Sequence, residues 1–182
     1  MSLHEVTKGT QFEKLAEMMA QGEANGVMMY YALARLAREQ SYEDVVADFI
    51  DAANQEAVHA GFYAVLNGKY PRDFWDMVRG LMAAETSGEA RIKSWADDFR
   101  AAGFAEAADE MEVFARQEGH HGELLKRILE KYHPELLDET NKKIYVCACC
   151  GYEYVGELDD EPEDYVCPLC GQPKRVFRLR EK

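Results

Sequence analysis

The sequence lacks any long apolar run, any excess of basic charge and, before position 147, any cysteine. Its apolar runs fall short of the roughly 20 residues that cross a bilayer, so no membrane contact is expected. The first eleven residues contain no apolar segment of the kind that a secretory signal needs, and we therefore expect a cytoplasmic protein. The formal net charge is −13 without a basic patch. Because phosphate backbones bind basic surfaces, neither DNA nor RNA is an expected partner.

The length and the distribution of charge predict two domains. A chain of 182 residues has room for one full-sized domain and for a module too small to fold by apolar burial alone. Residues 1–140 carry 14 basic and 26 acidic side chains, whereas residues 141–182 carry 7 and 8. All five cysteines lie between Cys147 and Cys170. We therefore predict a helical domain over 1–140 and a metal-binding domain over 141–182.

Apolar residues at helical spacing predict four helices in the first domain, over about 10–39, 41–66, 72–102 and 104–133. Thr10 and Glu13 predict a capping box at the first helix, and Asn67 with Gly68 predicts a left-handed end to the second. Short turns join the first helix to the second and the third to the fourth. The expected fold is an all-α, four-helix bundle of two antiparallel hairpins, followed by a small strand-and-turn module.

The connection between the two hairpins is short compared with the length of a helix. In a bundle with one long crossover, residues 67–75 must span a helix length of roughly 30 Å, which nine extended residues of about 3.3–3.6 Å each barely achieve. A dimer that exchanges hairpins relieves this strain. We therefore expect a homodimer, with swapped hairpins as one possible form.

Each predicted helix carries a glutamate in the middle of its apolar stripe, where an unpaired carboxylate is costly. The second and fourth helices add a histidine three residues later, on the same face. The spacing from the first glutamate to the second equals that from the third to the fourth, 33 residues, and the whole set repeats at an offset of 62. The set is Glu23, Glu56, His59, Glu85, Glu118 and His121.

Two glutamates and two Glu-x-x-His pairs on four helices are the ligand set of di-iron and di-manganese bundles. Two divalent ions neutralise four carboxylates, and neutral histidines complete the coordination. Any one of these glutamates by itself is better explained as a surface residue. That explanation does not suit six side chains that are related by a single offset. We therefore predict that they bind two metal ions and form the catalytic centre.

The cysteines form two paired knuckles, Cys147-x-x-Cys150-Gly and Cys167-Pro-Leu-Cys170-Gly. Clustered pairs of this kind are typical of metal ligands rather than disulfides in a chain without a signal peptide. Four sulfurs hold either structural zinc or a single redox iron, and zinc is the commoner occupant. Cys149 lies inside the first knuckle and is predicted to be a bystander.

Together these residues resemble the rubrerythrin family, in which a ferritin-like di-iron domain precedes a rubredoxin-like domain. The resemblance covers nearly the entire chain. It implies iron at the four cysteines, transfer of electrons from that iron to the di-iron site, and reduction of hydrogen peroxide to water. One departure concerns the third helix: rubrerythrins carry an additional glutamate three residues after the ligand, where this chain has Gly88. Glu89, the next residue, could still lean toward the metals.

Three functions remain open at this point. The first is a peroxidase-type oxidoreductase of oxidative-stress defence, which acts on hydrogen peroxide or dioxygen and takes electrons from a reductase. The second is a ferroxidase or iron-handling protein, favoured by the symmetric ligand set that Gly88 leaves. The third is a non-enzymatic metal-sensing or interaction protein with zinc in the four-cysteine module.

Overall fold

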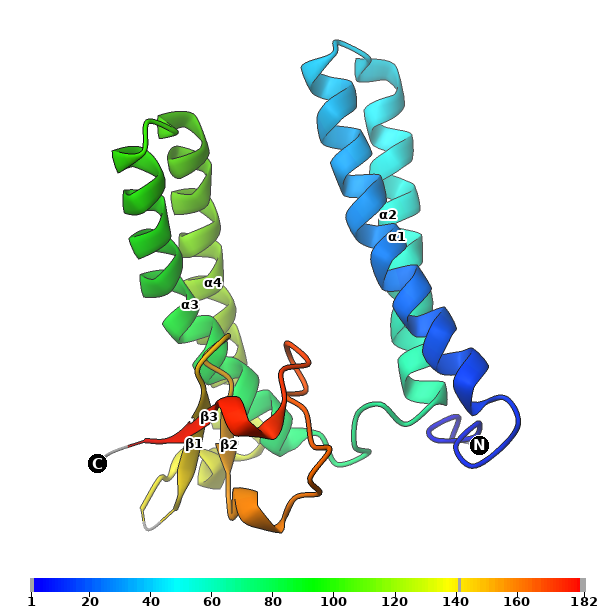
Figure 1. Cartoon of the computed structure of the whole chain (residues 1–182), viewed down its shortest axis with the longest axis vertical. Helices are drawn as coiled ribbons and strands as arrows, with labels where there is room; N and C mark the ends of the chain where they lie inside the picture. The colour runs from blue at the N-terminus through cyan, green and yellow to red at the C-terminus, as the bar shows by residue number, and fades with distance from the viewer. Residues whose placement is uncertain (1, 141, 181–182) are drawn as a thin grey trace. The chain divides into compact units, whose positions relative to one another are not determined.

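The structure is a computed structural model that describes residues 2–140 and 142–180. It contains four long helices, α1 (Glu13–Glu39), α2 (Glu43–Leu66), α3 (Trp75–Ala101) and α4 (Ala105–Tyr132), and a small sheet of β1 (Ile144–Cys147), β2 (Glu153–Val155) and β3 (Phe177–Leu179), as Figure 1 shows. Short 3-10 helices cover Pro134–Leu137, Leu158–Asp160 and Lys174–Val176. The four predicted helices and the strand-and-turn module are confirmed.

The chain divides into two compact units, Met1–Arg72 and Asp73–Lys182. The second hairpin and the C-terminal module therefore belong to the same unit. The predicted domain boundary falls at Asn141, which lies outside the described residues, as do residues 1, 181 and 182. The division into 1–140 and 141–182 stays a prediction. In the part of the chain that the structure describes, no helix is long and apolar enough to cross a membrane.

The first unit is the α1–α2 hairpin, in which small side chains let two helices pack closely. The buried residues of α1 are all alanines, and α2 adds Val46, Ala53 and Ala64. The hairpin ends as predicted: Gly68 has a positive φ of 64°, and the Lys69 N–H donates to the Ala64 carbonyl at 2.9 Å.

The capping box predicted at the start of α1 is wrong in detail. The Thr10 hydroxyl accepts a hydrogen bond from the Phe12 N–H at 3.1 Å, and the Glu13 carboxylate accepts one from the Gly9 N–H at 2.7 Å. Gly9 has a positive φ of 71°. This turn brings the Gly9 N–H, rather than that of Thr10, within reach of Glu13.

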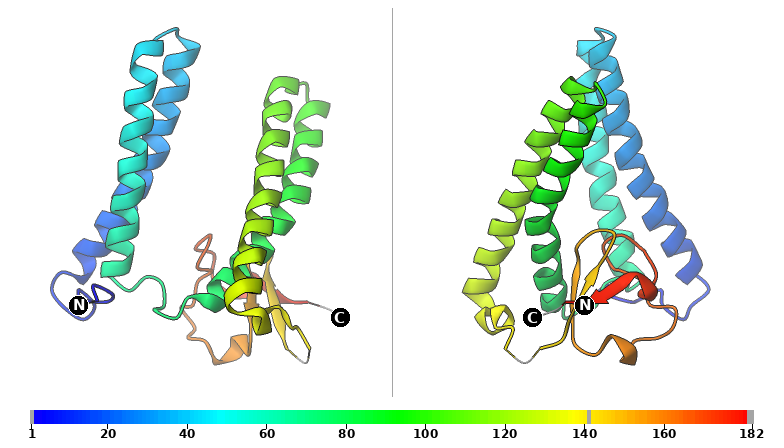
Figure 2. Two further views of the ribbon diagram at one scale, coloured as in Figure 1. Left: turned by 180° about the vertical axis from the view of Figure 1, so that it is seen from behind. Right: turned by 60° about the vertical axis from the view of Figure 1, so that its left-hand side comes forward.

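The second unit combines the α3–α4 hairpin with the module. The strand order is β2-β1-β3, with both pairs antiparallel. The module, yellow to red in Figure 2, lies beside α3 in both views. A Cβ built on Gly80 would lie 2.5 Å from Tyr152 Cζ, so only glycine permits this approach. Ala84 of α3 is buried in one cluster with Cys147, Cys167 and Phe177. The helix therefore forms part of the module's core.

A ring of four charged side chains fastens the module to α3. Arg79 is 2% exposed and donates to Glu139 and Glu153, each at 2.6 Å. Arg180 donates to the same two carboxylates. Because a buried charge is costly without partners, this ring selects one position of the module on the helix.

Each hairpin leaves large apolar side chains exposed. A pair of helices that buries mainly alanine has little core of its own, so both hairpins need a further apolar surface to pack against. The exposed residues include Met18, Met29, Leu36, Val58 and Phe62 in the first hairpin and Trp95, Phe99, Phe114 and Leu124 in the second.

Replacing Arg79 with methionine should destabilise the second unit. We expect a loss of roughly 3 kcal/mol, at the lower end of the cost of removing one partner from a buried ion pair, because Arg180 still neutralises Glu153. Urea unfolding followed by tryptophan fluorescence measures this, since both tryptophans, Trp75 and Trp95, lie on α3.

The matched control is Lys143→Met, which removes an exposed cation of the same unit. Its ion pair with Glu157 spans 2.6 Å, but both side chains are about half exposed. A loss below about 1 kcal/mol is expected. Equal effects of the two substitutions would contradict the role given to Arg79.

Candidate metal centres

Three groups of side chains bring their ligand atoms within 4.8 Å of one another. The first unit contains one group and the second unit contains two. All ten side chains predicted as metal ligands from the sequence take part. The groups are Glu23, Glu56 and His59; Glu85, Glu118 and His121; and Cys147, Cys150, Cys167 and Cys170.

The first helical group joins α1 to α2. His59 Nδ1 lies 3.2 Å from Glu56 Oε2 and 3.9 Å from Glu23 Oε2. A hydrogen bond in which the Glu23 carboxyl group donates to Glu56 raises the pKa of Glu23 and lowers the pKa of Glu56. Two carboxylates this close repel each other, so ionising both is unfavourable without a compensating cation. A divalent metal ion would supply that compensation.

The second helical group joins α3 to α4 with the same chemistry. His121 Nδ1 lies 3.2 Å from Glu85 Oε2, so this histidine contacts the glutamate of the opposite helix. The hydrogen bond with Glu85 raises the pKa of Glu118. Each hairpin thus holds half of the predicted set. That the six residues come together in a single two-metal site stays a prediction.

Glycine lies three residues after the first glutamate of each group. A Cβ on Gly26 would lie 3.4 Å from Glu56 Cγ, and a Cβ on Gly88 would lie 3.3 Å from Glu118 Oε2. These are tight approaches, so Glu118 occupies the space beside Gly88. Glu89 does not join the second group: its carboxylate accepts a hydrogen bond from Lys93 at 2.8 Å. In this structure Glu89 does not supply the additional carboxylate.

The four-cysteine group has the geometry of a tetrahedral metal site. The Sγ atoms of Cys147 and Cys170 are 3.7 Å apart, and those of Cys150 and Cys167 are 3.6 Å apart. A tetrahedron with metal–sulfur bonds of about 2.3 Å has edges of about 3.8 Å. The four sulfurs are therefore arranged for a metal ion. Cys149 is exposed and stands outside the group.

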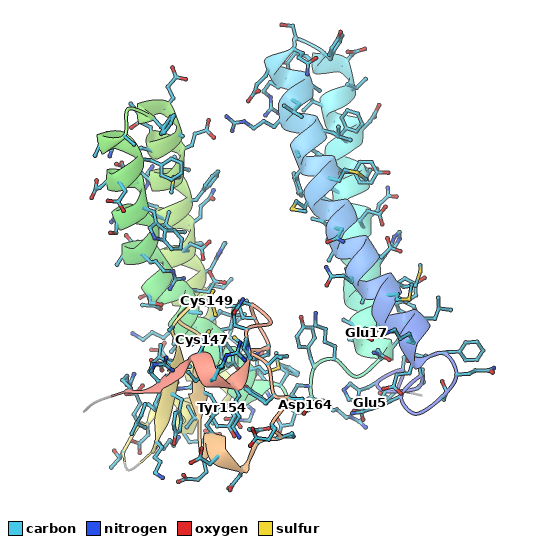
Figure 3. The ribbon with its side chains drawn as sticks, viewed as in Figure 1. Glu5, Glu17, Cys147, Cys149, Tyr154 and Asp164 are labelled. Atoms are coloured by element: carbon cyan, nitrogen blue, oxygen red, sulfur yellow. The ribbon has the colours of Figure 1, made fainter. Side chains whose placement is uncertain are left out.

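Both knuckles have the same backbone. The Gly151 N–H donates to the Cys147 carbonyl at 2.9 Å, and the Gly171 N–H donates to the Cys167 carbonyl at 2.8 Å. Both glycines have positive φ, 78° and 71°. Figure 3 shows Cys147 and Cys149 at the end of the module next to α3.

Burial raises the pKa of the Cys150 thiol far above its usual range and that of Cys167 to about 11. For Cys170, burial also opposes ionisation, but hydrogen bonds from the Gln172 backbone and neighbouring thiols outweigh it and lower the pKa. Without metal, at least two of the four sulfurs are protonated at neutral pH.

Two polar residues that the sequence did not single out contact the first knuckle. A Cβ built on Gly151 would collide with Ser87 Oγ and would lie 2.8 Å from Arg91 Nη1. Both residues lie on α3, about one turn of helix apart. Nothing in the local sequence marks them, because they meet Gly151 only through tertiary packing.

No protein-family model matches the chain. An uncharacterized protein of Methanocaldococcus jannaschii is 31% identical over 127 residues, which cover 70% of this chain and 90% of that protein. The rubrerythrin of Porphyromonas gingivalis is 25% identical over 186 residues, which cover 93% and 90%. Rubredoxin 4 of a Rhodococcus species is 42% identical over 52 residues, 21% of this chain and 87% of that rubredoxin. The chain belongs to the rubrerythrin family.

A solved structure of nigerythrin in its mixed-valence state covers 99% of this chain and 94% of its own, at 22% identity and a TM-score of 0.31. The family assignment rests on the sequence relatives. The fold class of this rubrerythrin-family chain is the predicted one, a ferritin-like helical bundle with a rubredoxin-like module.

The cofactors of a rubrerythrin-family chain are a di-iron centre and a rubredoxin-type iron. The donor atoms here fit both. Carboxylate and imidazole suit iron in the helical groups, and the four sulfurs are spaced for a single tetrahedral ion. The chain is thereby a non-haem di-iron protein of the oxidoreductase class.

Loading the four-cysteine group should release protons. Cobalt(II) reports this site alone through its thiolate absorption. Because the pKa values of Cys150 and Cys167 lie above neutral pH and metals bind thiolates, the apparent affinity should rise as pH increases toward about 11, by roughly tenfold per pH unit for each proton released. Titrations at several pH values measure this.

Cys149→Ser is the control and should leave the titration unchanged, whereas Cys150→Ser should abolish tetrahedral binding. An affinity that does not change across the neutral range would contradict the protonated state of these thiols.

Proposed function

We propose that this rubrerythrin-family protein is a peroxidase-type oxidoreductase that reduces hydrogen peroxide to water in oxidative-stress defence. One observation carries the proposal: the four-cysteine module is packed on α3, a helix of the hairpin that carries half of the proposed di-iron site. Ala84 is buried with Cys147 and Cys167, and Glu85 is the next residue. This proximity supports electron transfer from the cysteine iron to the helical centre.

The proposed metal ligands are the ten residues of the three groups. Each helical group offers two carboxylates, which neutralise one Fe²⁺, so two groups neutralise two ions. A pair of irons held by the two helical groups would supply the two electrons needed to cleave an O–O bond, and an iron held by the four cysteines would supply one-electron redox chemistry.

The side chains contribute position and open coordination sites. Glu85 and Glu118 reach the second group from different helices, so a bound ion is held by both α3 and α4. Only three protein ligands come from each group, which leaves positions for a facing group and for substrate. Within a single chain His59 and His121 are 54% and 53% exposed, so each group is open to a facing hairpin or to substrate.

The ferroxidase alternative rests on Gly88. Because this position carries no carboxylate and Glu89 binds Lys93, the helical ligand set is symmetric between the two hairpins. In this alternative Fe²⁺ is a substrate that leaves the site, whereas in the peroxidase it is a resident cofactor. The zinc-containing interaction protein differs from both by having a colourless cysteine site.

A homodimer with exchanged hairpins is the assembly that we propose. Helix α2 has 24 residues and is about 36 Å long. The link over residues 67–74 reaches at most about 29 Å, too little to run back along α2 within one chain. The exposed apolar residues of each hairpin supply a surface for a hairpin of another chain. Each di-iron site would then combine two chains.

Mixing the fully reduced protein with hydrogen peroxide in a stopped-flow instrument should oxidise both kinds of iron. Glu118→Ala removes a proposed ligand and should slow oxidation of the helical irons by about 100-fold or more. The matched control is Glu123→Ala, an exposed glutamate of the same helix, which should react like the wild type. A rubredoxin-like visible spectrum identifies iron rather than zinc at the cysteines.

Absence of peroxide-dependent oxidation in the wild type would overturn the peroxidase. Repeated turnover with added Fe²⁺ and dioxygen, with iron leaving the protein in each cycle, would instead support the ferroxidase.

Exchange of hairpins is tested by combining two damaged chains. One chain carries Glu56→Ala in the first hairpin and the other carries Glu118→Ala in the second. In a swapped heterodimer one site receives both lesions and the other receives none. Purification by two different tags, followed by iron analysis, should therefore recover about half of the wild-type di-iron content. In an unswapped dimer every site carries one lesion, so no recovery would contradict the exchange.

A further inference from the structure

We propose that the positive charge of Arg91 of α3 raises the reduction potential of the four-cysteine iron. The inference rests on the proposed iron at that site. It goes further by assigning control of the cysteine module to a side chain of the helical domain.

Arg91 lies between the two metal groups of the second unit. Its Nη1 would be 2.8 Å from a Cβ on Gly151, which follows Cys150, and its Nη2 would be 3.6 Å from a Cβ on Gly88. Gly88 in turn lies against Glu118. One guanidinium therefore borders both the first knuckle and the turn of α3 that faces the carboxylate group.

Among the residues that the structure describes, no carboxylate forms an ion pair with Arg91, whereas Arg79 and Lys93 on the same helix form ion pairs at 2.6 and 2.8 Å. The Arg91 guanidinium donates a hydrogen bond to the Ser87 hydroxyl at 3.5 Å, and its Nε is buried without a partner in this part of the chain. Its Cζ lies over the Trp95 ring, 5.8 Å from the ring centroid. The charge of Arg91 therefore acts on its surroundings without a neutralising carboxylate in contact with it.

Reduction of the cysteine iron adds negative charge to the site. Four thiolates give a net charge of −1 with Fe³⁺ and −2 with Fe²⁺. A nearby cation stabilises the more negative form, so Arg91 should raise the reduction potential. Its position makes α3 a determinant of how readily the module accepts an electron.

Spectroelectrochemical titration of the visible absorption of the cysteine iron tests this in the full-length, iron-loaded protein. Arg91→Gln should shift the reduction equilibrium toward Fe³⁺ by about tenfold, or about 59 mV for one electron. Arg91→Lys keeps the charge and should retain most of the wild-type potential. Lys93→Gln removes an exposed, paired cation two residues away and should leave the potential unchanged.

An unchanged potential in Arg91→Gln, with a normal wild-type couple and visible spectrum, would overturn this inference alone. An equal shift in Lys93→Gln would also overturn it, because the effect would then reflect the net charge of the protein. A wild-type protein without the iron–thiolate absorption would overturn both the proposed iron and the role of Arg91.

Discussion

The mutual repulsion of paired carboxylates is the constraint on which the structure depends. Glu23 lies beside Glu56, and Glu85 beside Glu118, so closely that the pKa of one carboxyl group in each pair, Glu23 and Glu118, is raised. Helices that bring such pairs together gain stability from a cation that offsets the repulsion. Small residues make this approach possible, since Gly26 and Gly88 let the neighbouring helix carry its glutamate inward. Metal binding and helix packing are therefore two aspects of one arrangement.

The C-terminal module extends this arrangement along α3. Gly80 and Gly151 allow backbone and side chains of the two parts to meet, and the charge ring around Arg79 selects a single position. As a result, the module that contains the four cysteines packs against α3, the helix that carries Glu85. The module is too small to fold by apolar burial alone, and α3 contributes part of its hydrophobic core.

The division of the helical ligands between two hairpins connects the site to assembly. Neither hairpin buries much beyond alanine, and each exposes large apolar side chains together with a half-open metal group. In the dimer that we propose, a second hairpin would cover these apolar faces and complete the metal coordination. Assembly and metal loading would then support each other thermodynamically.

The sequence by itself determined the four helices, the left-handed end of α2 at Gly68 and all ten side chains of the three groups. It could do so because helical periodicity, the 62-residue repeat and the knuckle spacing are local or repeated patterns. The placement of Arg91 beside Gly151 and the ion pair between Arg79 and Glu153 were decided by tertiary structure alone. Each joins residues that are 60 or more positions apart in the sequence, and contacts between distant residues leave no periodic trace in the sequence.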